Sequence, residues 1–487
     1  PRVSARSMRI VVVGAGVGGL AAAARLAAAG HLVTVLEQGP RAGGKAGRWE
    51  RGGYTFDTGP SLLTMPWVFH ELFADTGAPL DAHVELMRVE PVTRYRFVDG
   101  SGFDLSADLP VAIEALEAWS PGAGSDWTCF LGTCAAMWRA ATPFLSGPPP
   151  WPPRRPRRGE AAPDARALLG VRPWHTLRSL ARVHARDPRL RLVIERFATY
   201  AGADPRRAPA ALAVAGYVEH AFGAWHVRGG LYRLVEALVQ RLAALDVELR
   251  FGERVTGIMR SGRRVSGVIT DAGEMLAADV VVWNGDALTL EEMLRGGSSG
   301  SRKPPRERSL SGFALMLGLR GRRQDLVHHA ITFPADYDAE FDDVFEQRRL
   351  VRDPTLYVSA SCATDPAQAP ADAENWFVLV NAPAGARLSP SQEDAYEAQL
   401  IERLGVRERV VVSARRAPSE LERETGAVGG AIYGAAPHGR LGTMRRPGPV
   451  VRGVRGLYRV GGTAHPGGGL PLVALSGAIV AKLIGDP

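Results

Sequence analysis

The sequence predicts an α/β fold with more than one domain, and three observations support this class. Residues 8–38 have the pattern of a strand, a glycine turn, a helix and a second strand. Several β-rich segments cluster between residues 313 and 381. Residues 456–487 then give another strand, a glycine-rich turn and an apolar helix. A chain of 487 residues is also too long for a single hydrophobic core, so we expect two or three domains.

The N-terminal unit is predicted in detail. Residues 10–13 are a β-branched run, which is typical of a buried parallel strand. The alanine-rich residues 20–29 favour a helix, and Gly30 is suited to end it. Residues 32–36 then form the second strand. This order is that of the first strand–helix–strand unit of a doubly wound fold.

The turn between the first strand and the helix carries Gly14, Gly16 and Gly19 in the pattern G-x-G-x-x-G. The first glycine permits a tight turn, the second lets the backbone approach a pyrophosphate, and the third lets the helix pack on the strand. Glu37 follows the second strand, near the spacing of about 20 residues expected of a carboxylate that binds a ribose hydroxyl. The sequence therefore predicts a dinucleotide site.

The residues after this strand favour FAD over NAD. Many two-domain flavoproteins carry E-x-x-x-R-x-G-G-[RK] at this point. The pattern is matched here by Glu37, Arg41, Gly43, Gly44 and Lys45.

Composition excludes several classes of function. The formal net charge is +8, but the excess is almost all arginine, as expected from a GC-rich coding bias, and no nucleic-acid motif accompanies it. We therefore expect no nucleic-acid partner. The cysteines, Cys129, Cys134 and Cys362, form neither an even disulfide framework nor a zinc pattern. This usage suits a reducing cytoplasm and predicts no metal site.

No apolar run of about 18 residues suggests a membrane-spanning helix. The basic, proline-rich residues 146–165 are expected to form a linker or exposed loop, and residues 171–200 to form basic amphipathic helices. Both segments suit contact with anionic lipid, and both equally suit a solvated protein surface. Met8 is the plausible native start, with residues 1–7 as an upstream remnant.

The remaining elements follow from local patterns. We expect a hairpin at 48–60, a helix after Pro66, strands within 84–97, and helices at 111–119, 126–144 and 229–245. Strands are expected at 247–251, 254–258, 265–270 and 279–283, and a loop at 295–308. Strands at 313–319, 327–333, 355–361 and 376–381 predict an antiparallel sheet in a second domain. A helix at 389–404, a strand at 410–413, a strand at 456–460 and a helix from Ser476 complete the chain.

Several segments resemble the bacterial phytoene-desaturase family of carotenoid desaturases. They include DTGPSLLTMP at 57–66, FATYAGADPRRAPA at 197–210, VEHAFGAWHVRGGLYRL at 218–234 and GGTAHPGGGLPLVALSG at 461–477. HHAITF at 328–333 and GAIYG at 430–434 also fit, so the similarity spans nearly the whole chain. The C-terminal block is the most specific of these segments.

The resemblance implies a flavin amine oxidase-like α/β fold. It combines a split Rossmann-like FAD-binding domain with an antiparallel-sheet substrate domain and a helical, membrane-associating region. The implied division assigns 8–65, 216–288 and 451–487 to FAD binding, 66–92 and 289–450 to the substrate domain, and 93–215 to the helical region. The implied location is the cytoplasm, peripheral on the cytoplasmic face of the membrane.

The resemblance also implies which residues hold FAD. The pyrophosphate would lie against Gly14, Gly16, Val17, Gly18 and Gly19, with Lys45 near the phosphates and Glu37 on the ribose. The adenine would contact Val255, and the flavin and ribityl chain would contact Gly59, Pro60, Ser61, Gly462, Leu470, Pro471 and Val473. The flavin-bound helix would begin near Leu472. His465 is the candidate acid or base, with a structural role in ordering the glycine turn as the equal alternative.

The implied activity is FAD-dependent desaturation of a C40 carotenoid in carotenoid biosynthesis, by hydride transfer to flavin N5 and loss of a proton. The C-terminal block favours 3,4 (or 3′,4′) desaturation of a hydroxylated or monocyclic carotenoid over multi-step desaturation of phytoene. A flavin amine or porphyrinogen oxidase and a non-enzymatic isoprenoid-binding protein are the alternatives from other classes. The sequence does not indicate an oligomeric state.

Overall fold

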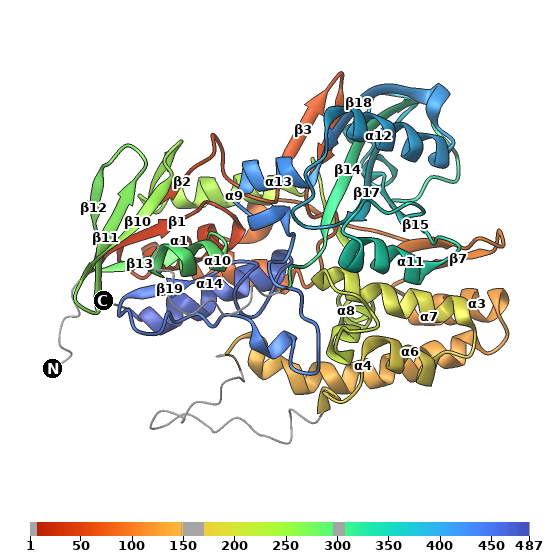
Figure 1. The fold of residues 1–487 in the computed structure, drawn as a ribbon, viewed down its shortest axis with the longest axis horizontal. Helices are drawn as coiled ribbons and strands as arrows, with labels where there is room; N and C mark the ends of the chain where they lie inside the picture. Colours follow the sequence, from red (N-terminus) through yellow and green to blue (C-terminus); the bar gives the residue numbers. More distant parts are fainter. Residues whose placement is uncertain (1–6, 148, 150–169, 296–306, 487) are drawn as a thin grey trace.

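The computed structural model describes residues 7–147, 149, 170–295 and 307–486. Figure 1 shows three layers of structure: a parallel sheet with its helices, a larger sheet, and a set of helices beneath that larger sheet. Most of the proline-rich segment predicted at 146–165, and most of the loop predicted at 295–308, lie outside the described residues.

The parallel sheet has five strands in the order β19-β13-β1-β2-β9. Their bounds are Leu457–Arg459, Val280–Trp283, Arg9–Val13, Leu32–Glu37 and Glu248–Phe251. Strands from both ends of the chain thus pair through β13, since Val281 lies opposite both Val11 and Leu457. β1 and β13 are apolar along most of their length because helices or loops cover both faces of a parallel sheet. The predicted split nucleotide-binding unit is built as expected from its strands.

Three helices pack on this sheet: α1 (Val17–Ala28), α9 (Tyr232–Ala243) and α14 (Leu470–Ile484). They share one hydrophobic core with α2 (Trp67–Asp75). Helix α14 begins six residues before the predicted Ser476, because Pro471 is tolerated in the first turn of a helix, where its missing N–H would be unpaired. An antiparallel sheet of β10 (Val255–Ser261), β11 (Arg264–Thr270) and β12 (Met275–Ala277) extends from this unit.

The larger sheet has seven strands in the order β18-β14-β17-β16-β15-β6-β7. Their bounds are Val410–Arg416, Ser311–Arg320, Ala373–Ala382, Leu356–Ser359, His329–Thr332, Thr93–Arg96 and Gly102–Leu105. The predicted antiparallel sheet is confirmed for its four strands, since β14–β17, β17–β16 and β16–β15 all pair antiparallel. The sheet also contains one parallel pair, between β15 and β6. These two strands come from segments more than 200 residues apart, so no hairpin dictates their direction.

The helical layer consists of α3 (Leu109–Trp119), α4 (Ala123–Leu145), α6 (Leu177–His184), α7 (Pro188–Glu195) and α8 (Val214–Phe222). Its core is rich in aromatic side chains, including Trp127, Phe130 and Phe197, and reaches the sheet through Phe333. The implied domain division assigned residues 93–105 to the helical region, but they form the strands β6 and β7. Of these, β6 lies within the strands predicted at 84–97. The alternation of buried and less buried residues in β6 and β7 suits a sheet edge.

The remaining elements connect these layers. They are β3 (Arg48–Arg51), β4 (Tyr54–Asp57), β5 (Leu86–Arg88), β8 (Trp225–Val227), α10 (Ala287–Arg295), α11 (Tyr337–Phe341), α12 (Pro390–Leu404) and α13 (Pro418–Thr425). The hairpin predicted at 48–60 is confirmed as β3–β4, with its turn at Gly52–Gly53. Among the described residues, no helix is long and apolar enough to span a bilayer.

Candidate active site

The glycine turn after β1 forms the floor of the candidate site. Gly14 has φ of +99°, a conformation that favours glycine, and its N–H donates to the Leu36 carbonyl at 2.7 Å. No side chain caps the N-terminus of α1 at Gly16, so the first N–H groups of the helix remain available to an anion. A Cβ at Gly19 would overlap the carbonyl oxygen of Gly14, so this glycine sets the distance between helix and strand.

Asn284, at the end of β13, completes the turn from the other side. Its amide nitrogen donates to the Gly14 carbonyl at 3.0 Å. A Cβ on Gly16 or Gly18 would come within 2.9 Å of the Asn284 side chain. No role was predicted for this asparagine. Its position directly after a strand of the parallel sheet, where ligands of this fold bind, was the available signal.

Glu37 stands at the end of β2, next to the turn. Its Oε2 accepts the N–H of Ala15 at 2.7 Å, and its Oε1 accepts the N–H of Gly39 at 2.8 Å. Each carboxylate oxygen has a second lone pair, so both can still accept a hydroxyl. The predicted contact with ribose stays a prediction, and the carboxylate is held in place for it by these two amides.

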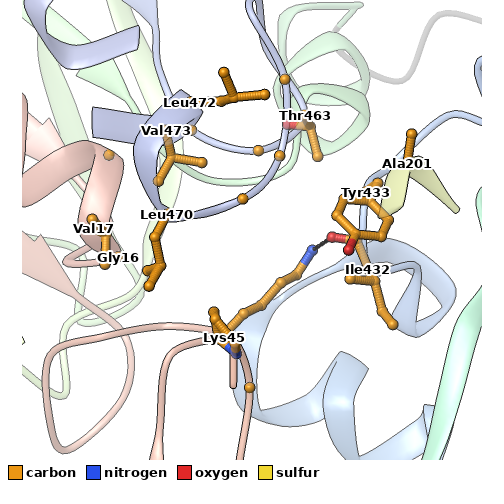
Figure 2. Close-up of a pocket in the computed structure, with 18 of the residues that line it drawn as sticks. Gly16, Val17, Lys45, Ala201, Ile432, Tyr433, Thr463, Leu470, Leu472 and Val473 are labelled. Atoms are coloured by element: carbon orange, nitrogen blue, oxygen red, sulfur yellow. Dashed lines mark hydrogen bonds between the residues drawn. The ribbon is translucent and has the colours of Figure 1, made fainter. Parts of the chain in front are cut away.

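Lys45 extends across the site. Its Nζ donates to the carbonyls of Ala431 and Ile432 at 2.9 and 2.6 Å. Figure 2 shows it directed toward Ile432 and Tyr433 rather than toward Gly16 and Val17, where the phosphates were expected. Burial, opposed by Asp286, lowers the pKa of Lys45 to about 8. The ammonium therefore connects the loop after β2 to residues 431–432.

The C-terminal block closes the floor. A Cβ on Gly18 would also come within 2.9 Å of the Cα of Gly461, so the first and last glycine segments touch. Gly461 donates its N–H to Ser476 Oγ at 2.8 Å. Leu470 and Val473, at the start of α14, point into the cavity beside Val17 (Figure 2). Segments more than 400 residues apart in the chain thus form one surface.

His465 is only 6% exposed, and its Nε2 lies 2.7 Å from the carbonyl of Phe144 and 3.1 Å from that of Gly147. Because carbonyls only accept, this nitrogen carries the proton in the neutral ring. Burial lowers the pKa of His465. The ring therefore ties the glycine block to the end of α4, which is the contact expected of the structural alternative. An acid or base role for His465 stays a prediction.

All the predicted site residues except Gly19 line one continuous cavity of about 1130 Å³. Beyond Gly59, Pro60 and Ser61 the cavity continues into an apolar chamber between the helical layer and the large sheet. Six residues typical of its wall are Trp138, Phe144, Leu212, Val218, Ile331 and Leu379. Three polar side chains lie in a row on this wall. Ser61 forms a hydrogen bond with the hydroxyl of Tyr357, which lies 2.9 Å from Nδ1 of His329.

Two further polar features of the cavity were not predicted. Arg446 donates to the carbonyls of Gly462 and Tyr433 at 2.9 and 3.2 Å, and burial lowers its pKa to about 10. In the chamber, Arg196 and Glu219 face each other among apolar side chains. No local pattern around Glu219 indicated that it would meet an arginine.

Comparison with known proteins identifies the family. Residues 17–299 of the chain match the sequence model of a protein family described as flavin-containing amine oxidoreductase. The chain is 36% identical over 500 residues to the hydroxyneurosporene desaturase of Rubrivivax gelatinosus, covering 98% of this chain and 93% of that protein. It is 34% identical over 499 residues to the 4,4′-diapolycopene oxygenase of Methylomonas sp., covering 99% of each.

A solved structure of putrescine oxidase with bound putrescine is similar to the fold, with a TM-score of 0.64 at 17% identity, covering 98% of this chain and 99% of that one. The chain belongs to the flavin-containing amine oxidoreductase family, as an FAD-dependent oxidoreductase. Within that family it belongs to the carotenoid desaturases, as the sequence resemblance indicated. The predicted flavin amine oxidase-like fold is confirmed.

Proposed function

We propose that this protein desaturates a C40 carotenoid with FAD, and that it forms the 3,4 (or 3′,4′) double bond of a hydroxylated or monocyclic carotenoid. The observation that carries the proposal is the single cavity that joins the glycine turn and Glu37 to an apolar chamber. A dinucleotide site open to an apolar chamber suits a long hydrocarbon substrate. The relative in Rubrivivax gelatinosus, whose name specifies a hydroxylated carotenoid, supports the finer assignment.

The site residues fit FAD because the glycines leave room for it. Gly16 and Gly18 provide a surface without side chains beside the uncapped N-terminus of α1, which suits the pyrophosphate. We assign Glu37 to the ribose, and we assign Gly59, Ser61 and Leu470, which line the same cavity, to the ring end of the cofactor. When bound, FAD supplies the hydride acceptor for desaturation.

The protein's own part is to bind, orient and exclude water. The side chains that line the chamber hold the polyene in an extended conformation beside the ring end of the cofactor site, and they exclude water from it. Desaturation also releases a proton from the carbon next to the one that loses hydride. His329 is buried next to this site, and burial lowers its pKa to about 3, so it remains neutral at physiological pH and does not store that proton.

The decisive experiment reconstitutes the purified protein with FAD and supplies neurosporene, hydroxyneurosporene, γ-carotene or phytoene in detergent micelles. We expect bleaching of the flavin absorption without oxygen and a product two hydrogens lighter, formed fastest from a hydroxylated or monocyclic substrate. A faster multi-step conversion of phytoene would establish the phytoene desaturase alternative. A product that gains oxygen would instead indicate the reaction named for the Methylomonas relative. Absence of bound flavin would contradict the proposal as a whole.

We further propose that the enzyme works on the membrane surface, peripheral on its cytoplasmic face, where a carotenoid is dissolved. The helical layer supports this assignment. Trp174 is 53% exposed and Val183 is 64% exposed, and Val183 lies on α6 next to Arg182. Exposed apolar side chains next to arginines suit binding at the interface of an anionic bilayer.

A further inference from the structure

Four hydrogen-bonded side chains at the apolar chamber form what we call the polar cluster: Arg196, Glu219, Tyr95 and Tyr200. Arg196 and Glu219 are its two charged members. Arg196 lies at the start of the 3-10 helix Arg196–Ala201, and Glu219 lies on α8. Both line the cavity, yet Arg196 is only 4% and Glu219 only 2% exposed. Charged groups at such depth are costly unless they are fully paired.

Most of the polar atoms in this cluster are paired with one another. Arg196 Nε donates to the Tyr95 hydroxyl at 2.6 Å, and its Nη1 donates to the Tyr200 hydroxyl at 2.9 Å. Tyr200 in turn donates to Glu219 Oε1 at 2.6 Å. The guanidinium also lies over the rings of Tyr95, Phe197 and Tyr200. The two charged groups are therefore held in fixed orientations.

One atom on each side is left without a hydrogen bond. Arg196 Nη2 and Glu219 Oε2 are both buried, and neither has a hydrogen-bond partner among the described residues. They lie 3.6 Å apart, which is an ion pair but longer than a hydrogen bond. Buried polar atoms are nearly always satisfied, so this gap between a donor and an acceptor calls for a ligand group.

The chemistry of the gap selects that group. A hydroxyl both accepts, here from Arg196, and donates, here to Glu219. A ketone oxygen only accepts and would leave Glu219 unpaired, an ammonium would oppose Arg196, and a carboxylate would oppose Glu219. A plain hydrocarbon end satisfies neither atom. Among these end groups, only an alcohol pairs both.

We propose that Arg196 and Glu219 bind the hydroxyl of a hydroxylated carotenoid end and thereby select that end for desaturation. This inference rests on the proposed function, and it names the residues that distinguish hydroxylated from unhydroxylated chains. Because the chamber around the cluster is apolar, the hydroxyl can be satisfied at this position while the rest of the chain stays in hydrocarbon surroundings.

The test compares hydroxyneurosporene with neurosporene, which differ by the hydroxyl, in wild type and in Glu219→Gln. The amide is isosteric, and its oxygen is kept toward the Tyr200 donor. Its NH₂ group then faces Arg196 Nη2, so the gap loses its acceptor. The selectivity ratio is kcat/KM for hydroxyneurosporene divided by kcat/KM for neurosporene, and we expect it to fall at least ~10-fold in Glu219→Gln.

Glu195→Gln is the matched control. Glu195 adjoins Arg196 in sequence, is similarly buried and pairs with an arginine, since Arg178 Nη2 lies 2.6 Å from its Oε2, but it does not line the cavity. The selectivity ratio should stay at the wild-type value in this control. The double variant Arg196→Met/Glu219→Leu removes both charges together, so no buried charge is left alone, and it should also lose the selectivity.

Equal losses on both substrates in Glu219→Gln, or no loss on either, would overturn the proposal and make the cluster structural. Failure of the wild type to convert any carotenoid would instead refute the proposed function. In that case retention of the two carotenoids from detergent micelles still decides the inference. Stronger retention of hydroxyneurosporene that disappears in Glu219→Gln supports the hydroxyl site, and equal retention by wild type refutes it.

Discussion

At the scale of single residues, the site depends on side chains whose partners are backbone groups. Glu37 accepts two backbone N–H groups, and Lys45 donates to two backbone carbonyls. Such contacts fix a charged group where a ligand can use it, and they link cofactor binding to stability. Changes at these positions therefore act on both properties.

We predict that Glu37→Gln weakens FAD binding ~10- to 100-fold, because a charged acceptor for the ribose is lost. The amide oxygen can keep one of the two backbone contacts, so the free energy of unfolding should fall by no more than about 1–3 kcal/mol. Titration of the FAD-free protein with FAD, followed by flavin fluorescence, gives the affinity. Glu248→Gln, on the neighbouring strand β9, is the control and should bind FAD normally. Unchanged affinity in Glu37→Gln would refute the ribose contact.

Lys45 should make the stability of the FAD-free protein depend on pH in a defined window. Its pKa is about 8 in the folded chain and near 10.5 when unfolded, so between these values the unfolded state binds more protons. Stability from this group therefore rises with pH from about 8 to 10.5, by about 3 kcal/mol in total, and is lowest below pH 8. The difference in unfolding free energy between wild type and Lys45→Met, measured with urea across this range, should show the rise. A constant difference would contradict the buried position of the ammonium.

At the scale of elements, the contact between α1 and α14 joins the two ends of the chain. A Cβ on Gly477 would lie 2.8 Å from the backbone nitrogen of Ala22 and 3.1 Å from the carbonyl oxygen of Gly18. The two helices approach this closely only because residue 477 has no side chain. Since Gly461 is tied to α14 through Ser476, the approach also positions the C-terminal glycines against the turn at Gly18.

Gly477→Ala should therefore lower the free energy of unfolding by about 1–3 kcal/mol through overpacking, and reduce FAD occupancy as well. Gly132→Ala is the matched control, because Gly132 also lies in a helix, α4, and nothing is within 4 Å of its added Cβ. That control should gain up to about 1 kcal/mol from helix propensity. Thermal unfolding and flavin absorption of both variants provide the comparison, and equal effects would contradict the packing argument.

At the scale of the whole molecule, one cavity is built by all three layers. The parallel sheet contributes the glycine turn and Glu37 to its lining, and the large sheet and the helical layer line the apolar chamber. In the proposed function the cofactor and the substrate meet where the layers meet, so a change in the helical layer should affect catalysis without affecting the flavin.

Ala215→Trp tests this separation. Ala215 lies on α8 and lines the chamber, so a bulky ring there should obstruct the substrate. We expect conversion of carotenoid to fall at least ~10-fold, with FAD content unchanged, since the glycine turn belongs to another layer. Product analysis and the flavin spectrum of one preparation measure both. Full activity would show that the polyene takes a different path.

The proposed membrane contact is tested by the double variant Trp174→Ser/Val183→Ser. Both residues are exposed, so folding should be unaffected, while co-sedimentation with vesicles containing anionic lipid should fall several-fold. The control is Val411→Ser, which should bind vesicles as wild type does. Val411 is an exposed valine on β18, in the seven-stranded sheet. Equal sedimentation of all three proteins would argue against attachment through the helical layer.

Local sequence patterns were sufficient to predict the strand–turn–helix unit at 8–38. They also predicted that the C-terminal glycine block belongs to the same nucleotide-binding unit. These features depend on glycine spacing and on hydrophobic periodicity over a few tens of residues, so they can be predicted from a short stretch of sequence. Most of the other strands and helices followed in the same way. Those not predicted are β7, β8, β12, α8, α10, α11 and α13, and α14 begins earlier than its apolar pattern predicted.

Which side chains meet inside the cavity could be found only from the tertiary structure. The direction of Lys45, the contact of Asn284 with the glycine turn and the pairing of Arg196 with Glu219 each join elements distant in the chain. Such pairings depend on how the layers are placed relative to one another, which no local pattern encodes. The cofactor is therefore apparent from the sequence, whereas the proposed basis for choosing a substrate lies in contacts between elements.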